Sequence, residues 1–290
     1  MRLLCIDSSG KTAGIAVCEE EKLLCESFLN AGFTHSQTLL PLLKSILATA
    51  ALSLKEIDGI AVSIGPGSFT GLRIGVSMAK GIAQATDLPC IGVSTLTVLA
   101  ESVRDFDGIL CPVMDARRGQ VYNAIFQGGS SFCRLTPDRA LSIEALGNEL
   151  QQKIYKKKFI LVGDGAEMCY NDKKFYGQTA EPSASAPPLA KTSASFANNR
   201  CVQQDCDNHP ASATEQDGMH QSNAPSFETR NLFLTALPNR LQRASCVGFA
   251  AFQMLREGHS FVSAAELIPQ YLRPSQAEQQ RLEKEKERQI

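Results

Sequence analysis

Short apolar runs and turn residues alternate over the start of the chain. Apolar runs at 3–6 and 14–18 flank Ser8-Ser9-Gly10, and an acidic run at 19–21 separates the second of them from an alternating segment at 23–28. Apolar runs of this length between turn residues are typical of strands. Connections this short join antiparallel neighbours, so the pattern predicts a three-stranded β-meander.

A helical period replaces this alternation after residue 35. The apolar side chains that recur at helical spacing between residues 35 and 51 are Leu39, Leu40, Leu42, Leu43, Ile46, Leu47, Ala50 and Ala51. This spacing predicts a helix. The stripe is wide, so we expect it to be buried against more than one surface. Pro41 is tolerated in such a helix if it lies in the first turn, where its missing N–H needs no partner.

The next fifty residues or so predict alternating strands and helices. We expect, in order, a strand at 57–64, a glycine-rich turn at 65–71, a helix to about residue 85, a strand at 89–93 and a helix to about residue 103. Ser94 or Thr95 caps the last of these helices. A meander followed by alternating helices and strands makes an α/β lobe with a mixed sheet.

A second lobe is predicted from about residue 107, with apolar strands at 109–114 and 121–126. Leu3-Leu4-Cys5-Ile6-Asp7 and Leu110-Cys111-Pro112-Val113-Met114-Asp115 both end on an aspartate at a hairpin that leads into another apolar strand. A similar order of strands and helices follows each of them. The repetition indicates an internally duplicated fold.

We therefore divide the chain into an N-terminal lobe of residues 1–104, a C-terminal lobe of residues 105–273 and a charged tail at 274–290. Residues 171 to about 230 are rich in Ser, Ala, Asn, Gln and Pro and have few large aliphatic side chains. Such a stretch buries too little surface to offset its ordering entropy, so we interpret it as a disordered or loosely packed insertion. Helical sequence resumes near residue 232 and runs to about 258.

Composition narrows the function classes. The chain has 290 residues, of which 43% are apolar and 20% charged, an ordinary balance for a globular protein with a real core. A net charge of −1 gives no basic footprint, which argues against strong nucleic-acid binding by this chain alone. Its apolar runs are too short for a signal peptide or a membrane span, so we expect a cytoplasmic protein with no membrane partner.

The ten cysteines fit a reducing compartment. Those that we expect to pack as small hydrophobic side chains within apolar runs are Cys5, Cys18, Cys25, Cys90, Cys111 and Cys133. Cys201, Cys206 and His209 could suggest a zinc site, but the set lacks a fourth ligand. We assign no metal to them, and the sequence leaves that question open.

Residues 65–75 form the most distinctive stretch, a glycine-rich segment between a predicted strand and a predicted helix. Such a segment can cradle phosphate on backbone N–H groups, or it can be a tight turn in which Ser68 or Thr70 caps the helix. It matches neither a Walker A loop nor the dinucleotide fingerprint, and the spacing favours the turn. The candidate nucleotide-binding residues at this turn and at the first hairpin are Asp7, Ser8, Ser9, Gly65 and Gly67.

Small residues recur every four positions on the following helix, at Gly71, Gly75, Ala79 and Ala83. A glycine inside a helix costs about 1 kcal/mol relative to alanine, so two on one face indicate the close approach of another backbone. That backbone belongs either to the chain's own sheet or to a helix of a partner. No Ser–His–Asp set, paired histidine ligands or Cys–His dyad can be assembled, and His35 is expected to cap its helix or make a surface contact.

Seven segments stand in the order that one known family shows. They are Ile6-Asp7-Ser8-Ser9; His35-Ser36-Gln37 with Leu39-Leu40-Pro41; Ser63-Ile64-Gly65-Pro66-Gly67-Ser68-Phe69-Thr70-Gly71-Leu72-Arg73-Ile74-Gly75; Val93-Ser94-Thr95-Leu96; Asp115-Ala116-Arg117-Arg118-Gly119 with Val121-Tyr122; Gly163-Asp164-Gly165; and Pro269-Gln270-Tyr271-Leu272-Arg273. On these segments the chain resembles the TsaB family, also called YeaZ, of tRNA threonylcarbamoyladenosine biosynthesis proteins. The resemblance is strong over residues 1–126 and patchy beyond.

The resemblance implies two actin-like lobes of the RNase H-like (ASKHA) class and a non-catalytic role. Family members pair with the catalytic subunit TsaD, and the ATPase TsaE joins them, so tRNA is met through the complex. The catalytic relatives carry a His-x-x-x-His pair that binds iron or zinc; here His35 is followed four residues later by Leu39, and one imidazole cannot replace the pair. We expect no cofactor, with ATP or ADP that is weakly bound or shared with a partner as the alternative.

Two other functions stay open at this stage. One is an active ATP-dependent transferase or kinase of the same superfamily, and the other, less favoured, is a metallopeptidase. A homodimer of the isolated chain is a further alternative. For the scaffolding role we expect the two helices at 35–51 and 70–85 to meet TsaD. The predicted interface residues are Leu39, Leu43, Ile46, Leu47, Gly71, Ile74, Gly75, Met78, Ala79 and Ile82.

Overall fold

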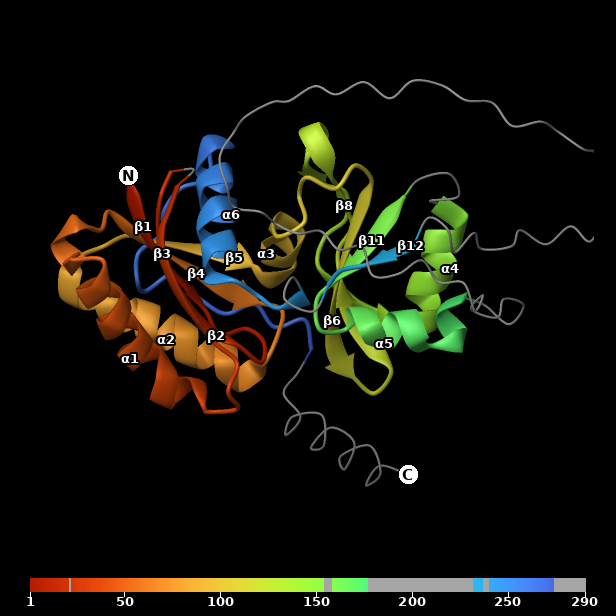
Figure 1. Cartoon of the computed structure of the whole chain (residues 1–290), viewed down its shortest axis with the longest axis horizontal. Coiled ribbons are helices and arrows are strands. Elements are labelled where there is room, and N and C mark those ends of the chain that lie inside the picture. Colours follow the sequence, from red (N-terminus) through yellow and green to blue (C-terminus); the bar gives the residue numbers. More distant parts are fainter. Residues whose placement is uncertain (21, 154–157, 177–231, 237–239, 274–290) are drawn as a thin grey trace, which may run out of the picture.

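The computed structural model describes residues 1–20, 22–153, 158–176, 232–236 and 240–273. Two lobes lie side by side, each built on its own β-sheet with helices against it (Figure 1). The fold is therefore α/β with two mixed sheets. No helix in the described ranges is long and apolar enough to cross a membrane.

The first lobe has a five-stranded sheet in the order β3-β2-β1-β4-β5. Its strands are β1 (Arg2–Asp7), β2 (Ala13–Glu19), β3 (Lys22–Leu29), β4 (Gly59–Gly65) and β5 (Cys90–Ser94). The predicted meander is confirmed, since β1 to β3 pair antiparallel, and β1, β4 and β5 then pair parallel. The helices and the 3₁₀ turn that follow these strands are α1 (His35–Thr49), η1 (Leu54–Glu56), α2 (Phe69–Thr86) and α3 (Thr95–Glu101).

The second sheet repeats that plan. Its main path runs β10-β7-β6-β11-β12, so the strand order along the chain is the same as in the first sheet. The strands are β6 (Ile109–Arg117), β7 (Gln120–Asn123), β8 (Phe126–Gln127), β9 (Cys133–Arg134), β10 (Arg139–Ser142), β11 (Phe159–Val162) and β12 (Leu232–Leu234). The helices and 3₁₀ turns of this lobe are η2 (Gly129–Ser131), α4 (Ile143–Lys153), α5 (Ala166–Asn171) and η3 (Lys173–Tyr176). The predicted internal duplication is confirmed by this shared order.

The last described helix, α6 (Ala244–Arg256), packs on the first lobe. Val247, Ala251 and Phe252 are buried in one cluster with Leu3 and Cys5 of β1. Our division at residue 104 is therefore wrong for the end of the chain, because the helix covers the face of the first sheet that α1 and α2 leave open (Figure 1). The prediction of one helix from 232 to 258 is also wrong, since its first residues form β12 beside β11.

The low-complexity insertion starts later than we expected. Phe175 and Tyr176 are buried in the second core, and the Tyr176 hydroxyl donates to the Tyr170 carbonyl oxygen over 2.7 Å. Buried aromatic side chains of this kind are part of the folded core, so these two residues do not belong to the insertion. Residues 177–231, the three candidate zinc ligands among them, and the tail at 274–290 lie outside the described residues.

Two local expectations are corrected. Pro41 lies inside α1, beyond its first turn. Because proline has no N–H, the Gln37 carbonyl oxygen lacks its usual helical hydrogen bond. Gln37 is exposed. Cys133 is exposed on the short strand β9, unlike the buried thiols of Cys5, Cys18, Cys90 and Cys111. The eight cysteines of the described residues are all free.

Candidate functional site

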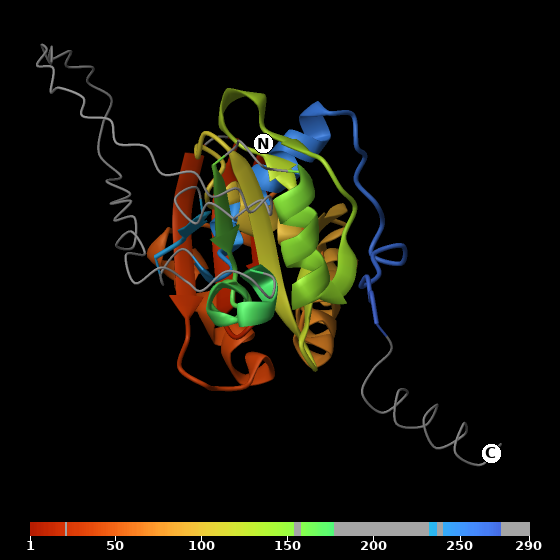
Figure 2. The same ribbon diagram turned by 90° about the vertical axis from the view of Figure 1, so that its right-hand side faces the viewer.

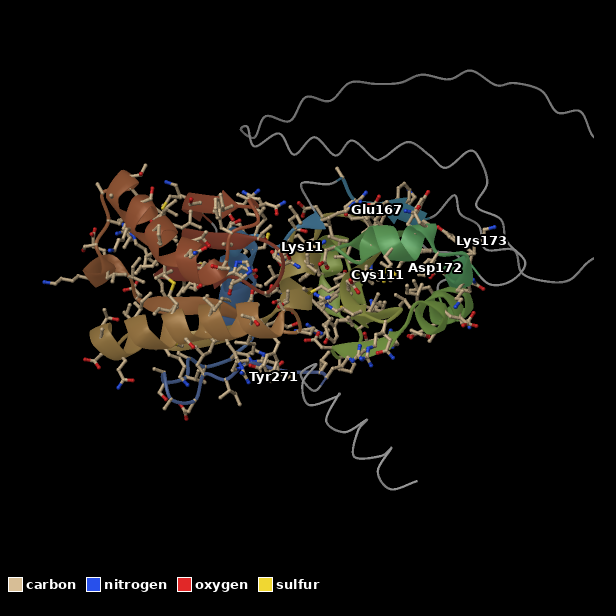
Figure 3. All side chains as sticks on the ribbon, turned by 90° about the horizontal axis from the view of Figure 1, so that it is seen from below. Lys11, Cys111, Glu167, Asp172, Lys173 and Tyr271 are labelled. Carbon is tan, nitrogen blue, oxygen red and sulfur yellow. The ribbon has the colours of Figure 1, made fainter. Side chains whose placement is uncertain are left out.

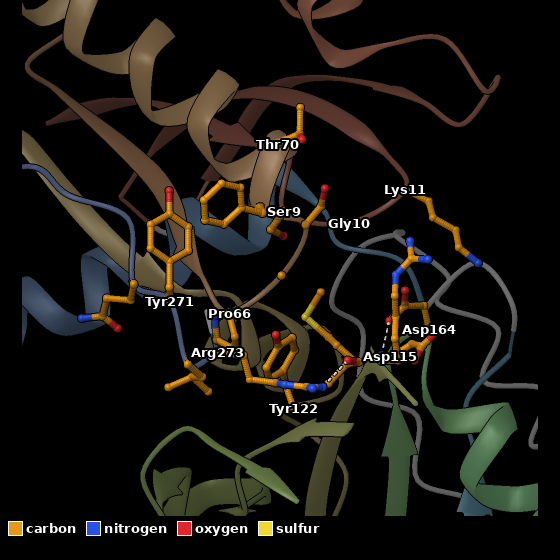
Figure 4. Close-up of a pocket in the computed structure, with 18 of the residues that line it drawn as sticks. Ser9, Gly10, Lys11, Pro66, Thr70, Asp115, Tyr122, Asp164, Tyr271 and Arg273 are labelled. Atoms are coloured by element: carbon orange, nitrogen blue, oxygen red, sulfur yellow. Dashed lines mark hydrogen bonds between the residues drawn. The ribbon is translucent and has the colours of Figure 1, made fainter. Parts of the chain in front are cut away.

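A cleft of about 930 Å³ opens between the lobes. The β1–β2 turn, the start of α2, the β6–β7 turn and residues 270–273 form its walls (Figure 4). Lys11, Asp115 and Asp164 lie on one side of the cleft and Tyr271 on the other. Seen from below, Lys11 and Tyr271 both lie at the junction of the two lobes (Figure 3). The volume falls within the usual range for small-molecule pockets.

Residues 262–273, which we call the C-terminal strap, run along the outside of the molecule from α6 to this cleft (Figure 2). Val262 exchanges two backbone hydrogen bonds with Cys90, and Lys80 donates from Nζ to the Leu267 carbonyl oxygen at 3.1 Å. At the far end, Arg273 donates from Nη1 to the carbonyl oxygen of Ala116 in the second lobe at 2.7 Å. The strap therefore fastens the first lobe to the second.

The candidate residue Asp7 lies beneath the cleft with no exposed surface. Its carboxylate accepts from the backbone N–H and the hydroxyl of Ser9, at 3.1 and 3.0 Å, and from the Ser63 hydroxyl. Burial raises the pKa of Asp7, and the hydrogen bonds from Ser63 and Ser9 oppose that rise. With these partners in place, Asp7 ties β1 to its own turn and to β4.

Of the other four candidate nucleotide-binding residues, two line the cleft and two are packed inside the fold. Ser9 and Gly67 line the cleft, whereas the buried Ser8 donates from its hydroxyl to the Gly71 carbonyl oxygen at 2.8 Å. A Cβ at Gly67 would lie closer than 3.0 Å to the Ser9 carbonyl oxygen, and one at Gly65 would lie equally close to that of Gln270. The glycines thus let the segment pack on the first hairpin and the strap.

The turn interpretation of the glycine-rich segment agrees with the local geometry. Ser68 is the N-cap of α2, and its hydroxyl accepts from the Gly71 N–H at 3.2 Å. Its own backbone N–H donates to the Ser9 carbonyl oxygen at 2.7 Å. A cap of this kind satisfies one of the N–H groups that a helix start leaves open.

A second, apolar hollow lies between α1 and α2 on the outside of the first lobe. This hollow, the α1–α2 groove, has a volume of about 630 Å³. The residues that line it are His35, Ser36, Leu39, Leu40, Phe69, Thr70, Arg73, Ile74, Ser77 and Met78. Leu40 is 51% exposed at its rim. His35 caps nothing; its Nε2 instead makes a hydrogen bond with the Gly10 carbonyl oxygen at 3.0 Å.

The predicted interface residues fall into two groups. Those buried against the chain's own sheet are Leu39, Leu43, Ile46, Gly71, Gly75 and Ala79, and those only partly buried are Leu47, Ile74, Met78 and Ile82. The small-residue face of α2 is the inward one, because a Cβ at Gly71 or Gly75 would collide with Ser8. We correct the prediction accordingly: the buried group serves the fold, and a large residue at Gly75 should damage the core.

Sequence reasoning missed the residues that join the groove to the cleft. The Arg73 guanidinium carbon lies 3.8 Å from the centre of the Phe69 ring, and the Tyr271 ring centre lies 4.6 Å from that of Phe69. Arg73 also donates from Nε to the Tyr271 hydroxyl at 3.1 Å. Phe69 and Arg73 line both hollows. The available sequence signal for these contacts was the Pro269–Arg273 motif, which contains Tyr271.

Two duplicated α/β lobes with a cleft between them define a protein of the actin-like (ASKHA) class. Two solved structures from Pseudomonas aeruginosa share the whole fold. One is an uncharacterized protein with similarity to peptidase YeaZ, with a TM-score of 0.65 and 21% identity over 94% of this chain and 99% of that one. The other is YeaZ, with a TM-score of 0.64 and 20% identity over 93% of this chain and 99% of that one.

The sequence comparisons give the family. The family model for TsaD, tRNA N6-adenosine threonylcarbamoyltransferase, matches residues 30–281. A TsaB from Bacillus subtilis strain 168 is 41% identical over 127 residues, 44% of this chain and 56% of the relative. One from Escherichia coli K12 is 38% identical over 134 residues, 44% of this chain and 55% of the relative. The match thus spans about half the length of these two relatives.

A third relative is covered more fully. A TsaB from Buchnera aphidicola of Schizaphis graminum is 33% identical over 168 residues, 56% of this chain and 78% of the relative. This chain belongs to the TsaB (YeaZ) family, within the wider group that the TsaD model describes.

Proposed function

We propose that this chain is a non-catalytic, cytoplasmic subunit of the complex that forms threonylcarbamoyladenosine in tRNA. It docks to a TsaD-type catalytic subunit and supports that subunit's activity. A TsaE-type ATPase joins the pair, and the chain contacts tRNA indirectly, through the complex. The relatives carry the name tRNA threonylcarbamoyladenosine biosynthesis protein TsaB, which supports the process.

The observation that carries the docking step is the α1–α2 groove. Leu40 is 51% exposed and lines the groove together with Ile74 and Met78. Large apolar side chains gathered over a hollow are a common mark of a protein–protein contact. The partner surface therefore consists of the outward residues of the two helices, Leu40, Ile74 and Met78, in place of the buried residues that the sequence suggested.

One observation supports a non-catalytic role. Leu39, four residues after His35, is 1% exposed and belongs to the first core, so an apolar side chain stands where the catalytic relatives carry a second histidine. Catalysis then falls to the partner, and any ATP or ADP is shared with it.

The groove offers a closely matched pair of variants. Leu40 and Leu135 are 51% and 52% exposed, and Leu135 lies on the second lobe, outside the groove. Leu40→Glu places a carboxylate in an interface that excludes water, and such a group has no partner there. We expect Leu40→Glu to weaken binding to the TsaD-type chain by at least about tenfold, while Leu135→Glu binds like the parent.

Binding would be measured by co-purification and by titration of the purified partner. Melting temperatures of both variants should stay close to that of the parent. Normal binding by Leu40→Glu would show that the partner docks elsewhere. A tRNA modification assay with each component left out tests the role itself: product formed by this chain alone would favour the enzyme alternative. Sedimentation of the isolated chain shows whether it forms a homodimer when the partner is absent.

A further inference from the structure

The α1–α2 groove is lined by apolar and small polar side chains and by one permanent positive charge. Among the described residues that line it, that charge belongs to Arg73. Arg73 is exposed, yet its guanidinium carbon lies 3.8 Å from the centre of the Phe69 ring. The two residues are four positions apart on α2, so they share one face of the helix. The ring therefore supports the charged group at the rim of the groove.

Tyr271 reaches this pair from the C-terminal strap. Its ring centre lies 4.6 Å from that of Phe69 and 5.8 Å from the Arg73 guanidinium carbon. The Tyr271 hydroxyl also accepts a hydrogen bond from Nε of Arg73 at 3.1 Å. A long side chain in solvent normally samples many rotamers, and fixing it costs entropy. Here the contacts with Phe69 and Tyr271 fix the arginine before any partner arrives.

The backbone that carries Tyr271 is held on both sides of it. Just before it, the Gln270 N–H donates to the Ile64 carbonyl oxygen at 2.7 Å. Just after it, Arg273 donates to a carbonyl oxygen of the second lobe at 2.7 Å. Further back along the strap, Leu267 is 2% exposed and belongs to the first core. Tyr271 cannot shift without breaking these contacts, so it is a rigid support for the arginine.

The guanidinium group of Arg73 keeps most of its donors available. The bond to Tyr271 uses Nε–H, which leaves the N–H groups of Nη1 and Nη2 for a partner. No carboxylate of the described residues forms an ion pair with Arg73. A planar fork of donors in a fixed place matches the two oxygens of a carboxylate. The side chain that fits this position is therefore an aspartate or glutamate of the partner.

We propose that Tyr271 is a positioning residue for docking: it holds Arg73 at the rim of the α1–α2 groove, where the guanidinium group binds a carboxylate of the TsaD-type chain. The inference rests on the proposed function, which places that chain in the groove through apolar contacts. A donor that is already held in its bound geometry loses less conformational freedom on binding. The strap thus contributes to docking through Arg73, without being the contact surface itself.

The test titrates the full chain with the purified TsaD-type chain at low and at high salt. Arg73→Gln removes the charge and should weaken binding by about tenfold. Tyr271→Phe keeps the ring and removes the hydroxyl, so it should weaken binding by roughly fivefold. In the Arg73→Gln background Tyr271→Phe should have no further effect, because no guanidinium group is left to hold. Both variants should also bind with less salt dependence than the parent, and a loss of stability alone would not change that dependence.

Ile268→Ala is the control, since Ile268 is 65% exposed on the strap and lines neither hollow. We expect it to bind like the parent; a loss equal to that of Tyr271→Phe would make the strap itself the contact surface and overturn the proposal. Normal binding by Tyr271→Phe, losses that multiply in the double variant, or a parent-like salt dependence of Arg73→Gln would also overturn it. Leu40→Glu separates the two proposals. Its normal binding refutes docking in the groove, whereas its loss of binding beside a parent-like Tyr271→Phe refutes only the role of Tyr271.

Discussion

Gly71 and Gly81 lie on the same helix, α2, but only Gly71 faces another part of the chain. A Cβ at Gly71 would lie closer than 3.0 Å to the Ser8 carbonyl oxygen and 3.1 Å from Cδ2 of His35. At Gly81 such an atom would meet no other described part of the chain within 4 Å. Alanine is favoured over glycine inside a helix by about 1 kcal/mol, so Gly81→Ala should raise the free energy of unfolding by that amount.

Gly71→Ala should have the opposite effect. The obstructing atom at this position is a backbone oxygen, which cannot rotate away as a side chain does, so the β1–β2 turn or the helix must move. Overpacking of this kind costs about 1–3 kcal/mol, and Gly71, in the first turn of α2, gains little from helix propensity. The net change should therefore be a loss of stability.

Urea denaturation followed by circular dichroism measures both changes, and thermal melting supports them. A change of 1 kcal/mol shifts melting by about 2–4 °C in a chain of this size. We expect a rise for Gly81→Ala and a fall for Gly71→Ala. If both substitutions raise stability equally, α2 does not pack on the β1–β2 turn, and the account of its small-residue face fails.

Two further predictions concern buried groups. Burial raises the pKa of Asp7 above its usual 3.8, so its contribution to stability is present below that pH and is lost as the pH rises through the raised value. Asp7→Asn should flatten the part of the stability profile that lies above that pH, and an unchanged slope in urea titrations would contradict it. Phe175 is fully buried in the second core, so Phe175→Ala should cost about 3–5 kcal/mol. A calorimetric melt like that of the parent would place Phe175 outside the core.

Most of the first lobe could be predicted because its elements are periodic. The meander, α1, α2 and the capped start of α3 follow directly from apolar spacing and turn residues. The strand β12 could not, because Leu232–Leu234 is too short to show a period. The lobe to which α6 belongs could not be predicted either, because the apolar pattern of a helix does not show which sheet the helix will cover.

The candidate site was also predictable only in part. Hydrophobic spacing showed that α1 is apolar on more than one side, but it could not say which side faces the chain's own sheet. Leu39 is buried and its neighbour Leu40 is half exposed. The contact between Arg73 and Tyr271 joins residues 198 positions apart. No local sequence pattern predicts a contact between residues so far apart in the chain.

The packing of α6 on the first sheet sets the order in which the protein can finish folding during synthesis. β1 and β2 leave the ribosome early, yet Leu3, Cys5 and Cys18 are covered by a helix that begins at Ala244. Most of the chain must be translated before that apolar face is shielded from water. Exposed apolar strands are prone to association, so we expect the first lobe to be prone to association until this helix has been made. Within this chain, the first sheet is therefore completed by a helix that is made more than two hundred residues later.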